Sequence, residues 1–314
     1  MRKTLRNYLR LLRPRQWIKN LAIFASITFT GQLFDVFIFT EVFYGFLIFC
    51  AISSAIYIFN DFFDIEKDKL HPFKRFRPLA SGEVPVANAL LIASILVAIS
   101  LVASFMITPA FFGITVFYLV LQLSYSVLLK DIEIIDILAL AGGYILRVYA
   151  GEVLGGYHIS VWLLLTTISL SLFLAIGKRR SELTLVSQYT HAQIAATRKT
   201  LSHYSEKLLD VYASIFATST FITYTLFTFL ENSRSTTITN ELLLPEFLPQ
   251  YLQKKWLMVT ILPVVYGLMR YLQDIYEKHE GESPEKVLIN DKPLLINLII
   301  WILLVIVIIY IIGA

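Results

Sequence analysis

The fold is decided by a long apolar segment that ends in a cluster of acidic side chains. Residues 42–68 read VFYGFLIFCAISSAIYIFNDFFDIEKD, and the first 19 of them carry no charge. A helix of about 20 largely apolar residues crosses the ~30 Å hydrocarbon core of a lipid bilayer. The segment therefore predicts a transmembrane helix that places an amide and three carboxylates at one membrane surface, namely Asn60, Asp61, Asp64 and Asp68.

The rest of the chain has the same apolar character. Of its 314 residues, 57% are hydrophobic and only 16% are charged, with a mean hydropathy of +0.68. This composition is too apolar for a domain whose surface faces water. We predict an all-α, polytopic integral membrane protein with a single transmembrane domain over residues 1–314. Its nine predicted spans are 18–38, 42–60, 86–107, 110–129, 135–154, 159–177, 210–230, 256–273 and 293–313.

The distribution of basic residues predicts the orientation of these spans. Lys and Arg that flank transmembrane helices are retained on the cytoplasmic side. The segments on the side of the N-terminus hold 23 of the 27 lysines and arginines. We therefore expect a protein of the cell membrane whose active site faces the cytoplasm, without a cleavable signal peptide. The expected cytoplasmic parts are a basic surface segment at 1–17 and the loops 61–85, 178–209 and 274–292.

The spacing of the acidic cluster suits a magnesium ion. If the helix continues beyond the membrane, residues 60, 64 and 68 lie one above another, and Asp61 is a neighbour of Asp64. Like charges stacked in this way repel, so the helix needs a compensating cation. Mg²⁺ prefers oxygen ligands and often bridges to substrate phosphates. We predict that Asn60, Asp61, Asp64 and Asp68 hold Mg²⁺ and that the three aspartates act at the catalytic centre.

A compact basic group follows the acidic cluster directly. Lys74, Arg75 and Arg77 lie between two prolines and could hold phosphate oxygens in an ordered loop. Together, the acidic and basic groups predict a clamp for a metal-bound diphosphate. The alternative is a juxtamembrane helix with solvated charges, but solvation alone requires neither this spacing nor an asparagine.

A second cationic group ends the sixth predicted span. Lys178, Arg179 and Arg180 could bind a phosphate directly through charge-assisted hydrogen bonds. They could equally end the span by extending toward the membrane surface.

Arg147 lies inside the fifth predicted span, where a charge requires a partner or an anionic ligand. Asp136 and Glu152 are its candidate partners on the same helix. The sequence leaves both explanations of Arg147 open, a structural ion pair and a ligand of the substrate. Weaker candidates for substrate binding are Lys19, Tyr125 and Lys130.

These motifs resemble the UbiA prenyltransferase superfamily. The pattern N-D-x-x-D-x-x-x-D at 60–68, followed by K-R-x-R-P-L at 74–79, is similar to its first aspartate-rich motif. Four further stretches resemble its decaprenyl-phosphate phosphoribosyltransferase branch, namely RPRQWIKN (13–20), YSVLLK (125–130), GKRRSEL (177–183) and GESPE (281–285).

The resemblance implies a UbiA-like helix bundle and a Mg²⁺-dependent transferase. The expected donor is phosphoribosyl pyrophosphate, and the expected acceptor is a polyprenyl phosphate of the decaprenyl type. Most prenyl-transferring members carry a second aspartate-rich motif where this chain has Lys178, Arg179 and Arg180. We therefore expect one metal–diphosphate site for the donor and one metal-free phosphate site for the lipid.

Two other functions share part of this pattern. A UbiA-type prenyltransferase would join a prenyl diphosphate to an aromatic or glycerol-phosphate acceptor. A transporter of anionic solutes would also have many helices and an intramembrane arginine, but no broken-helix pair or inverted repeat supports it. No motif predicts a nucleic-acid partner, and the sequence does not distinguish a monomer from a homo-oligomer.

The predicted topology can be checked by labelling single cysteines after replacement of the only native one, Cys50→Ala. A membrane-impermeant thiol reagent should reach four substituted positions from the cytoplasmic side: Leu70, Lys130, Thr190 and Glu285. Asn240 should be labelled only from outside. External labelling at residue 190 would contradict the nine-span arrangement.

Overall fold

The protein is all-helical wherever the computed structural model describes it, which is over residues 2–70, 74–186, 203–230, 255–276 and 284–312. Eight helical segments in these ranges are long and apolar enough to cross a membrane, so the predicted polytopic, all-α fold is confirmed. They are α3 Val36–Phe63, α5 Val86–Ile107, α6 Pro109–Val127, α7 Ile135–Gly155, α8 Val161–Val186, α10 Glu206–Leu230, η5 Trp256–Thr260 with α12 Ile261–Tyr276, and α14 Lys292–Ile306 with η6 Val307–Ile312.

The first predicted span is not one continuous α-helix. A surface helix, α1 (Arg2–Leu12), is followed by an 11-residue 3₁₀-helix, η1 (Pro14–Phe24), and by the short α2 (Ala25–Phe29). A 3₁₀-helix of this length is uncommon, because its hydrogen-bond geometry is poorer than that of an α-helix. The other short helices are α4 Ile65–Leu70, η2 Lys74–Phe76, η3 Leu129–Asp131 and α13 Pro284–Asn290.

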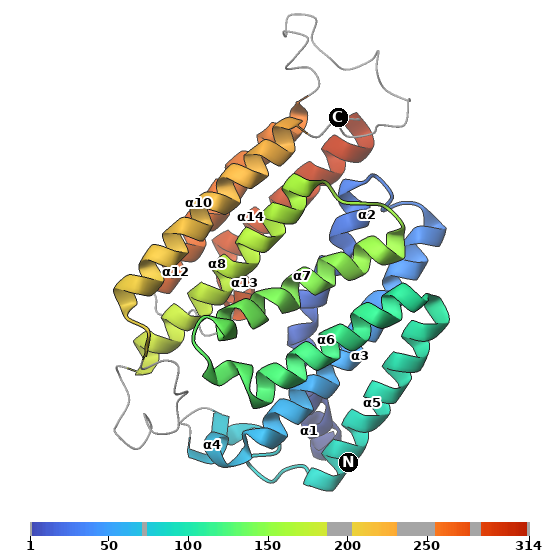
Figure 1. Ribbon diagram of the computed structural model, residues 1–314, viewed down its shortest axis with the longest axis vertical. Helices are drawn as coiled ribbons and strands as arrows, with labels where there is room; N and C mark the ends of the chain where they lie inside the picture. The colour runs from blue at the N-terminus through green and yellow to red at the C-terminus, as the bar shows by residue number, and fades with distance from the viewer. Residues whose placement is uncertain (1, 71–73, 187–202, 231–254, 277–283, 313–314) are drawn as a thin grey trace, which may run out of the picture.

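The long helices run obliquely to the long axis of the molecule, and the two termini lie at opposite ends (Figure 1). One group contains η1, α3, α5, α6 and α7, and the other contains α8, α10, α12 and α14, with α7 packed against α8 between them. The N-terminus and α4 share one end, which we call the α1 end. Parts of the predicted loops, residues 71–73, 187–202, 231–254 and 277–283, lie outside the described residues.

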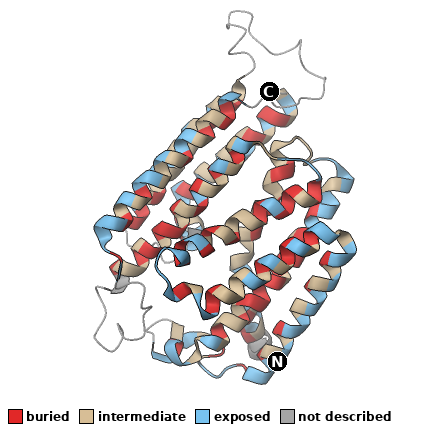
Figure 2. Cartoon of the chain, in the orientation of Figure 1, coloured by how far each residue is buried: buried red, intermediate tan, exposed pale blue. Residues whose placement is uncertain are grey.

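The outward faces of the bundle are apolar. Buried residues gather where helices face one another, and exposed residues lie on the outside (Figure 2). On α5, for example, Leu91, Ile95, Ile99 and Val102 are all exposed, and their spacing puts them on one helical face. A soluble protein rarely exposes so large an apolar surface. Lipid is therefore the expected neighbour of these residues.

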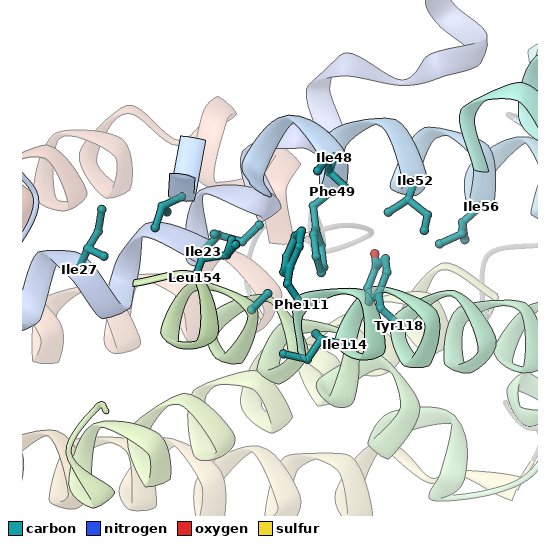
Figure 3. Packing of buried hydrophobic residues seen from close by; sticks show 12 residues of the cluster. Ile23, Ile27, Ile48, Phe49, Ile52, Ile56, Phe111, Ile114, Tyr118 and Leu154 are labelled. Carbon is teal, nitrogen blue, oxygen red and sulfur yellow. The ribbon is translucent and has the colours of Figure 1, made fainter. Parts of the chain in front are cut away.

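The largest core cluster joins η1 and α2 to three transmembrane helices (Figure 3). Ile23 and Ile27 meet Phe49 of α3, Phe111 of α6 and Leu154 of α7. The Phe49 ring lies 5.9 Å from the Phe111 ring, measured between centroids. These contacts fix one face of η1 against α3 and α7.

Gly151 of α7 allows η1 to approach so closely. A Cβ atom built on Gly151 would overlap the backbone carbonyl oxygen of Ile23. One turn later, a Cβ on Gly155 would lie 2.8 Å from the Ile27 side chain. Only glycine lets the backbone of η1 reach the surface of α7 at this point.

We expect Gly151→Ala to destabilise the protein, because η1 would have to move away from α7. Overpacking of this kind costs about 1–3 kcal/mol, and a lower apparent Tm in detergent would reveal it. Gly113→Ala is the matched control, because a Cβ on Gly113 of α6 meets nothing within 4 Å. Equal Tm values for the two variants would show that the close approach is not important.

Candidate active site

The aspartates lie where α3 leaves the apolar part of the bundle. α3 ends at Phe63, Asp64 is its C-cap, and α4 begins at Ile65. Backbone hydrogen bonds continue across this junction, from the Asp64 amide to the Asn60 carbonyl (3.1 Å) and from the Asp68 amide to the Asp64 carbonyl (2.8 Å). The one-turn spacing of Asn60, Asp64 and Asp68 is therefore kept.

Three protein cations neutralise the three carboxylates. Arg77 donates to Asp68 at 2.6 Å and to Asp61 at 3.1 Å. Arg13 also donates to Asp61, and Lys130 donates to Asp64 at 2.7 Å. These cations come from three separate places, before η1, after η2 and within η3. The charge compensation that the sequence analysis assigned to a metal is thus provided by the protein in this arrangement.

Sequence analysis missed Arg13 as a site residue. It precedes Pro14 in the RPRQWIKN stretch, and its backbone has φ of +52°, which is uncommon for a residue other than glycine. The Ser54 hydroxyl donates to the neighbouring Leu12 carbonyl at 2.8 Å and helps to hold this corner. The sequence signal was the R-P dipeptide after an amphipathic helix, but nothing local linked it to the aspartates.

Burial makes these ion pairs unlike those of a solvated surface. Asp61 and Asp68 are only 1% and 4% exposed, and Lys130 is 5% exposed. Burial raises the pKa of the Asp68 carboxyl above its ordinary value, and the Arg77 guanidinium opposes part of that rise. The second carboxylate oxygen of Asp61, Oδ2, is buried without a hydrogen-bond partner among the described residues.

The donor set fits an incompletely coordinated Mg²⁺. Within the described part of the chain, this arrangement contains no group of three His, Cys, Asp or Glu side chains that could hold a metal ion. Mg²⁺ seldom needs one, since it keeps several waters and uses substrate phosphates as ligands. The partnerless oxygen of Asp61 is a hard donor of the kind Mg²⁺ prefers. The carboxylates can therefore supply part of a coordination sphere that a diphosphate would complete.

The other predicted residues near this end differ in their placement. Asn60, Lys74 and Lys19 are half-buried, and Arg75 is exposed. The Arg75 guanidinium lies 4.8 Å from the centroid of the Phe76 ring. Of the basic residues predicted for this site, Arg77 and Lys130 form the ion pairs with the aspartates described above.

Arg179 belongs to a buried network. It is fully buried and donates to Asp136, to Glu182 and, at 2.7 Å, to the Tyr125 hydroxyl. Tyr204 donates its hydroxyl to Asp136 at 2.8 Å, and burial raises the pKa of Tyr204 so that it stays protonated. This network ties α6, α7, α8 and the segment before α10 together.

Lys178 and Arg180 flank Arg179 in the sequence. Arg180 donates to Asp210 at 2.8 Å and to Glu206 at 3.0 Å, and both acceptors belong to α10. Lys178 is half-buried. Direct binding of a lipid phosphate by these residues stays a prediction, and for both arginines it requires exchange of a protein carboxylate for the phosphate.

The predicted ion-pair partners of Arg147 were wrong. Asp136 pairs with Arg179, and Glu152 lies 2.8 Å from the His158 ring nitrogen Nδ1. Arg147 instead points from α7 toward η1 and α6, where it donates to the side chains of Asn20 and Tyr118. Spacing along α7 placed Asp136 on nearly the same helical face as Arg147, but the neighbouring helices decide which charges meet.

An open apolar groove lies between α6 and α7. It encloses about 460 Å³ and is lined by Ala110, Gly113, Ile114, Phe117, Leu146, Tyr149 and Val153. Phe117 and Tyr149 are exposed.

The chain is similar to proteins of a known family. A model of the UbiA prenyltransferase family matches residues 21–299. A decaprenyl-phosphate phosphoribosyltransferase of Corynebacterium glutamicum is 33% identical over 96% of this chain and 86% of its own length. One from Mycolicibacterium smegmatis is 34% identical, over 94% of this chain and 89% of its own.

The fold is also found in solved structures. A UbiA homolog from Archaeoglobus fulgidus, bound to GPP and Mg²⁺, matches with a TM-score of 0.68 and 21% identity. The match covers 96% of this chain and 99% of that one. The helical bundle is therefore the one that the sequence motifs predicted.

We expect Arg179→Gln to reduce the yield of folded protein, because Asp136 would be left as a buried charge without its cation. Breaking a buried pair in this way costs about 3–5 kcal/mol. Arg180→Gln should cost about 1 kcal/mol or less, since its partners Glu206 and Asp210 are partly exposed. Apparent Tm and the monodisperse fraction in detergent measure both effects, and Asp136→Asn should restore part of the loss in Arg179→Gln.

Proposed function

The chain belongs to the UbiA prenyltransferase family, and we propose that it transfers 5-phosphoribose from phosphoribosyl pyrophosphate to a polyprenyl phosphate of the decaprenyl type. Pyrophosphate is the other product. The observation that carries this proposal is the similarity, over nearly the whole chain, to relatives named decaprenyl-phosphate phosphoribosyltransferase. The buried aspartates with their cations give the proposed reaction a site.

The proposed location is the cell membrane, with the α1 end of the bundle toward the cytoplasm. The chain is a multi-pass membrane protein. The aspartates lie at the end of α3 and in α4, and α4 lies at the same end of the molecule as the basic helix α1 (Figure 1). Phosphoribosyl pyrophosphate is highly charged and water-soluble, so its site must open to an aqueous compartment. The excess of basic residues on this side supports the cytoplasm as that compartment.

In the proposed donor site, Asn60, Asp61, Asp64 and Asp68 hold Mg²⁺. A bound ion would neutralise the negative charge that develops on the departing pyrophosphate. Arg77 and Lys130 contact the carboxylates in the structure and are positioned to exchange these contacts for phosphate oxygens. Lys74 and Arg75, from the same basic loop, extend the positive surface on which the diphosphate would lie.

The proposed chemistry is a substitution at the anomeric carbon of the ribose. An oxygen of the lipid phosphate forms the new bond to C1, and the bond between C1 and the pyrophosphate oxygen breaks. The bonding electrons leave with pyrophosphate. A phosphate monoester has its second pKa near 6, so its dianion is a competent nucleophile at neutral pH and needs no general base. Lys19 and Lys178 are candidate ligands of this acceptor phosphate.

A reconstitution assay tests the proposal. Purified protein in nanodiscs would receive Mg²⁺, phosphoribosyl pyrophosphate and a polyprenyl phosphate, and pyrophosphate and phosphoribosylated lipid would be quantified. Formation of both products in equal amounts is expected. Transfer from a prenyl diphosphate to an aromatic or glycerol-phosphate acceptor, without use of phosphoribosyl pyrophosphate, would identify a prenyltransferase instead.

We expect Asp64→Ala and Asp68→Ala to lower turnover by a factor on the order of 10²–10³, because charge stabilisation of the leaving group is lost. Asp64→Asn should be similarly severe, since the amide lacks the charge that binds Mg²⁺. Glu66→Ala is the matched control, because Glu66 lies between these residues but its side chain is 84% exposed. Full wild-type turnover in excess chelator would contradict the role of the metal.

A further inference from the structure

A polar tract leads from the aspartates into the bundle. η1 lies alongside α3, and polar side chains pair successively along their contact. The pairs are Arg13 with Asp61, Gln16 with Tyr57 at 3.4 Å, and Asn20 with Ser53 at 3.5 Å. Because an α-helix rises 1.5 Å per residue, Ser53 lies about 12 Å deeper along α3 than Asp61.

Arg147 lies at the inner end of this tract. Its Nε donates to the Asn20 side-chain oxygen at 2.7 Å, and its terminal nitrogens donate to the Tyr118 hydroxyl at 2.6 Å and to the Gly143 carbonyl at 2.5 Å. All three acceptors are neutral. Within the described part of the chain, Arg147 takes part in no ion pair, although it is only 4% exposed.

Comparison with Arg179 shows what Arg147 lacks among the described residues, which is a carboxylate partner. Arg179 is equally buried but contacts two carboxylates, Asp136 and Glu182. A buried charge without a counter-charge is unfavourable in a membrane protein, and such residues usually face a partner or a ligand pathway. The rings of Tyr118 and Tyr144, 5.0 and 5.7 Å from the guanidinium carbon, offset part of that penalty but supply no negative charge.

The local backbone is shaped to bring Asn20 to Arg147. Gly151, one turn beyond Arg147 on α7, admits the η1 backbone at Ile23, one 3₁₀ turn after Asn20. A guanidinium has five N–H donors in a planar fork, and three are assigned to neutral acceptors. A phosphate offers three oxygens and the missing negative charge.

We propose that Arg147, assisted by Asn20, binds a phosphate monoester group of a substrate at the inner end of this tract. The inference rests on the proposed function, which supplies two such groups. One is the 5-phosphate of phosphoribosyl pyrophosphate, and the other is the phosphate of the lipid acceptor. Both present the same dianionic chemistry to the guanidinium, at a position separate from the diphosphate held by the aspartates.

The test measures binding without turnover. Detergent-purified wild type, Arg147→Gln and Arg147→Lys would be titrated with ribose 5-phosphate, with farnesyl phosphate, and with Mg²⁺–pyrophosphate as a probe of the aspartates. Arg6→Gln is the matched control, because Arg6 is exposed on α1. Loss of one charge-assisted hydrogen bond corresponds to about a ten- to hundredfold loss of affinity.

We expect Arg147→Gln to weaken one of the two monoester probes by that factor and to leave Mg²⁺–pyrophosphate unchanged. The probe that is weakened identifies whether the donor or the lipid supplies the phosphate. Arg147→Lys should lose less affinity than Arg147→Gln, since it keeps the charge without the planar fork. If Arg147→Gln does not yield monodisperse protein, Arg147→Lys is measured in its place. It should weaken binding of only one of the two monoester probes.

Three results would overturn the inference. These are failure of wild type to bind either monoester, unchanged affinity for both in a folded variant, and equal losses for all three probes. Because these measurements need no reaction, they remain separate from the proposed function. Absence of pyrophosphate release from wild type given both substrates would refute that function, whatever the binding data show.

Discussion

The contact of Asp61 with two arginines is the interaction on which the rest of the site depends. Arg13 lies between α1 and η1, and Arg77 lies directly after η2. One nearly inaccessible carboxylate therefore joins the N-terminal segment, the end of α3 and the loop that precedes α5. Without that carboxylate, two cations would meet in a region with little water to separate them. This charge balance links the residue before η1, the end of α3 and the residue after η2.

The bundle accommodates buried arginines in two different ways. Arg179 is surrounded by acids and phenols, and these contacts hold α6, α7 and α8 in place. Arg147 meets only neutral groups, about three turns further along α7 than Asp136. One helix thus contacts a charge-balanced arginine near its start and, near its middle, carries an arginine without a counter-charge among the described residues. α7 lies between these neighbours and packs against η1, α6 and α8.

Sequence reasoning found what depends on local pattern. Hydropathy located the spans, because length and apolarity are properties of a single helix, and the one-turn spacing of Asp64 and Asp68 is equally local. The partner of Arg147 could not be found in this way. Which face of α7 meets α8, and which meets η1, is decided by packing such as that at Gly151. The irregular first span could not be predicted from local pattern either, because its Gln16 and Asn20 pair with polar side chains of α3.

The carboxylates of the site are matched by an equal number of basic side chains. This balance affects the order in which the proposed metal and donor bind. The proposed divalent ion would compete with Arg77 and Lys130 for the carboxylates of Asp68 and Asp64. A diphosphate attracts those same cations and thereby releases the carboxylates for the ion. Linkage makes this help reciprocal, since each ligand raises the affinity of the other by the same factor. In the proposed reaction, metal and donor would therefore bind cooperatively.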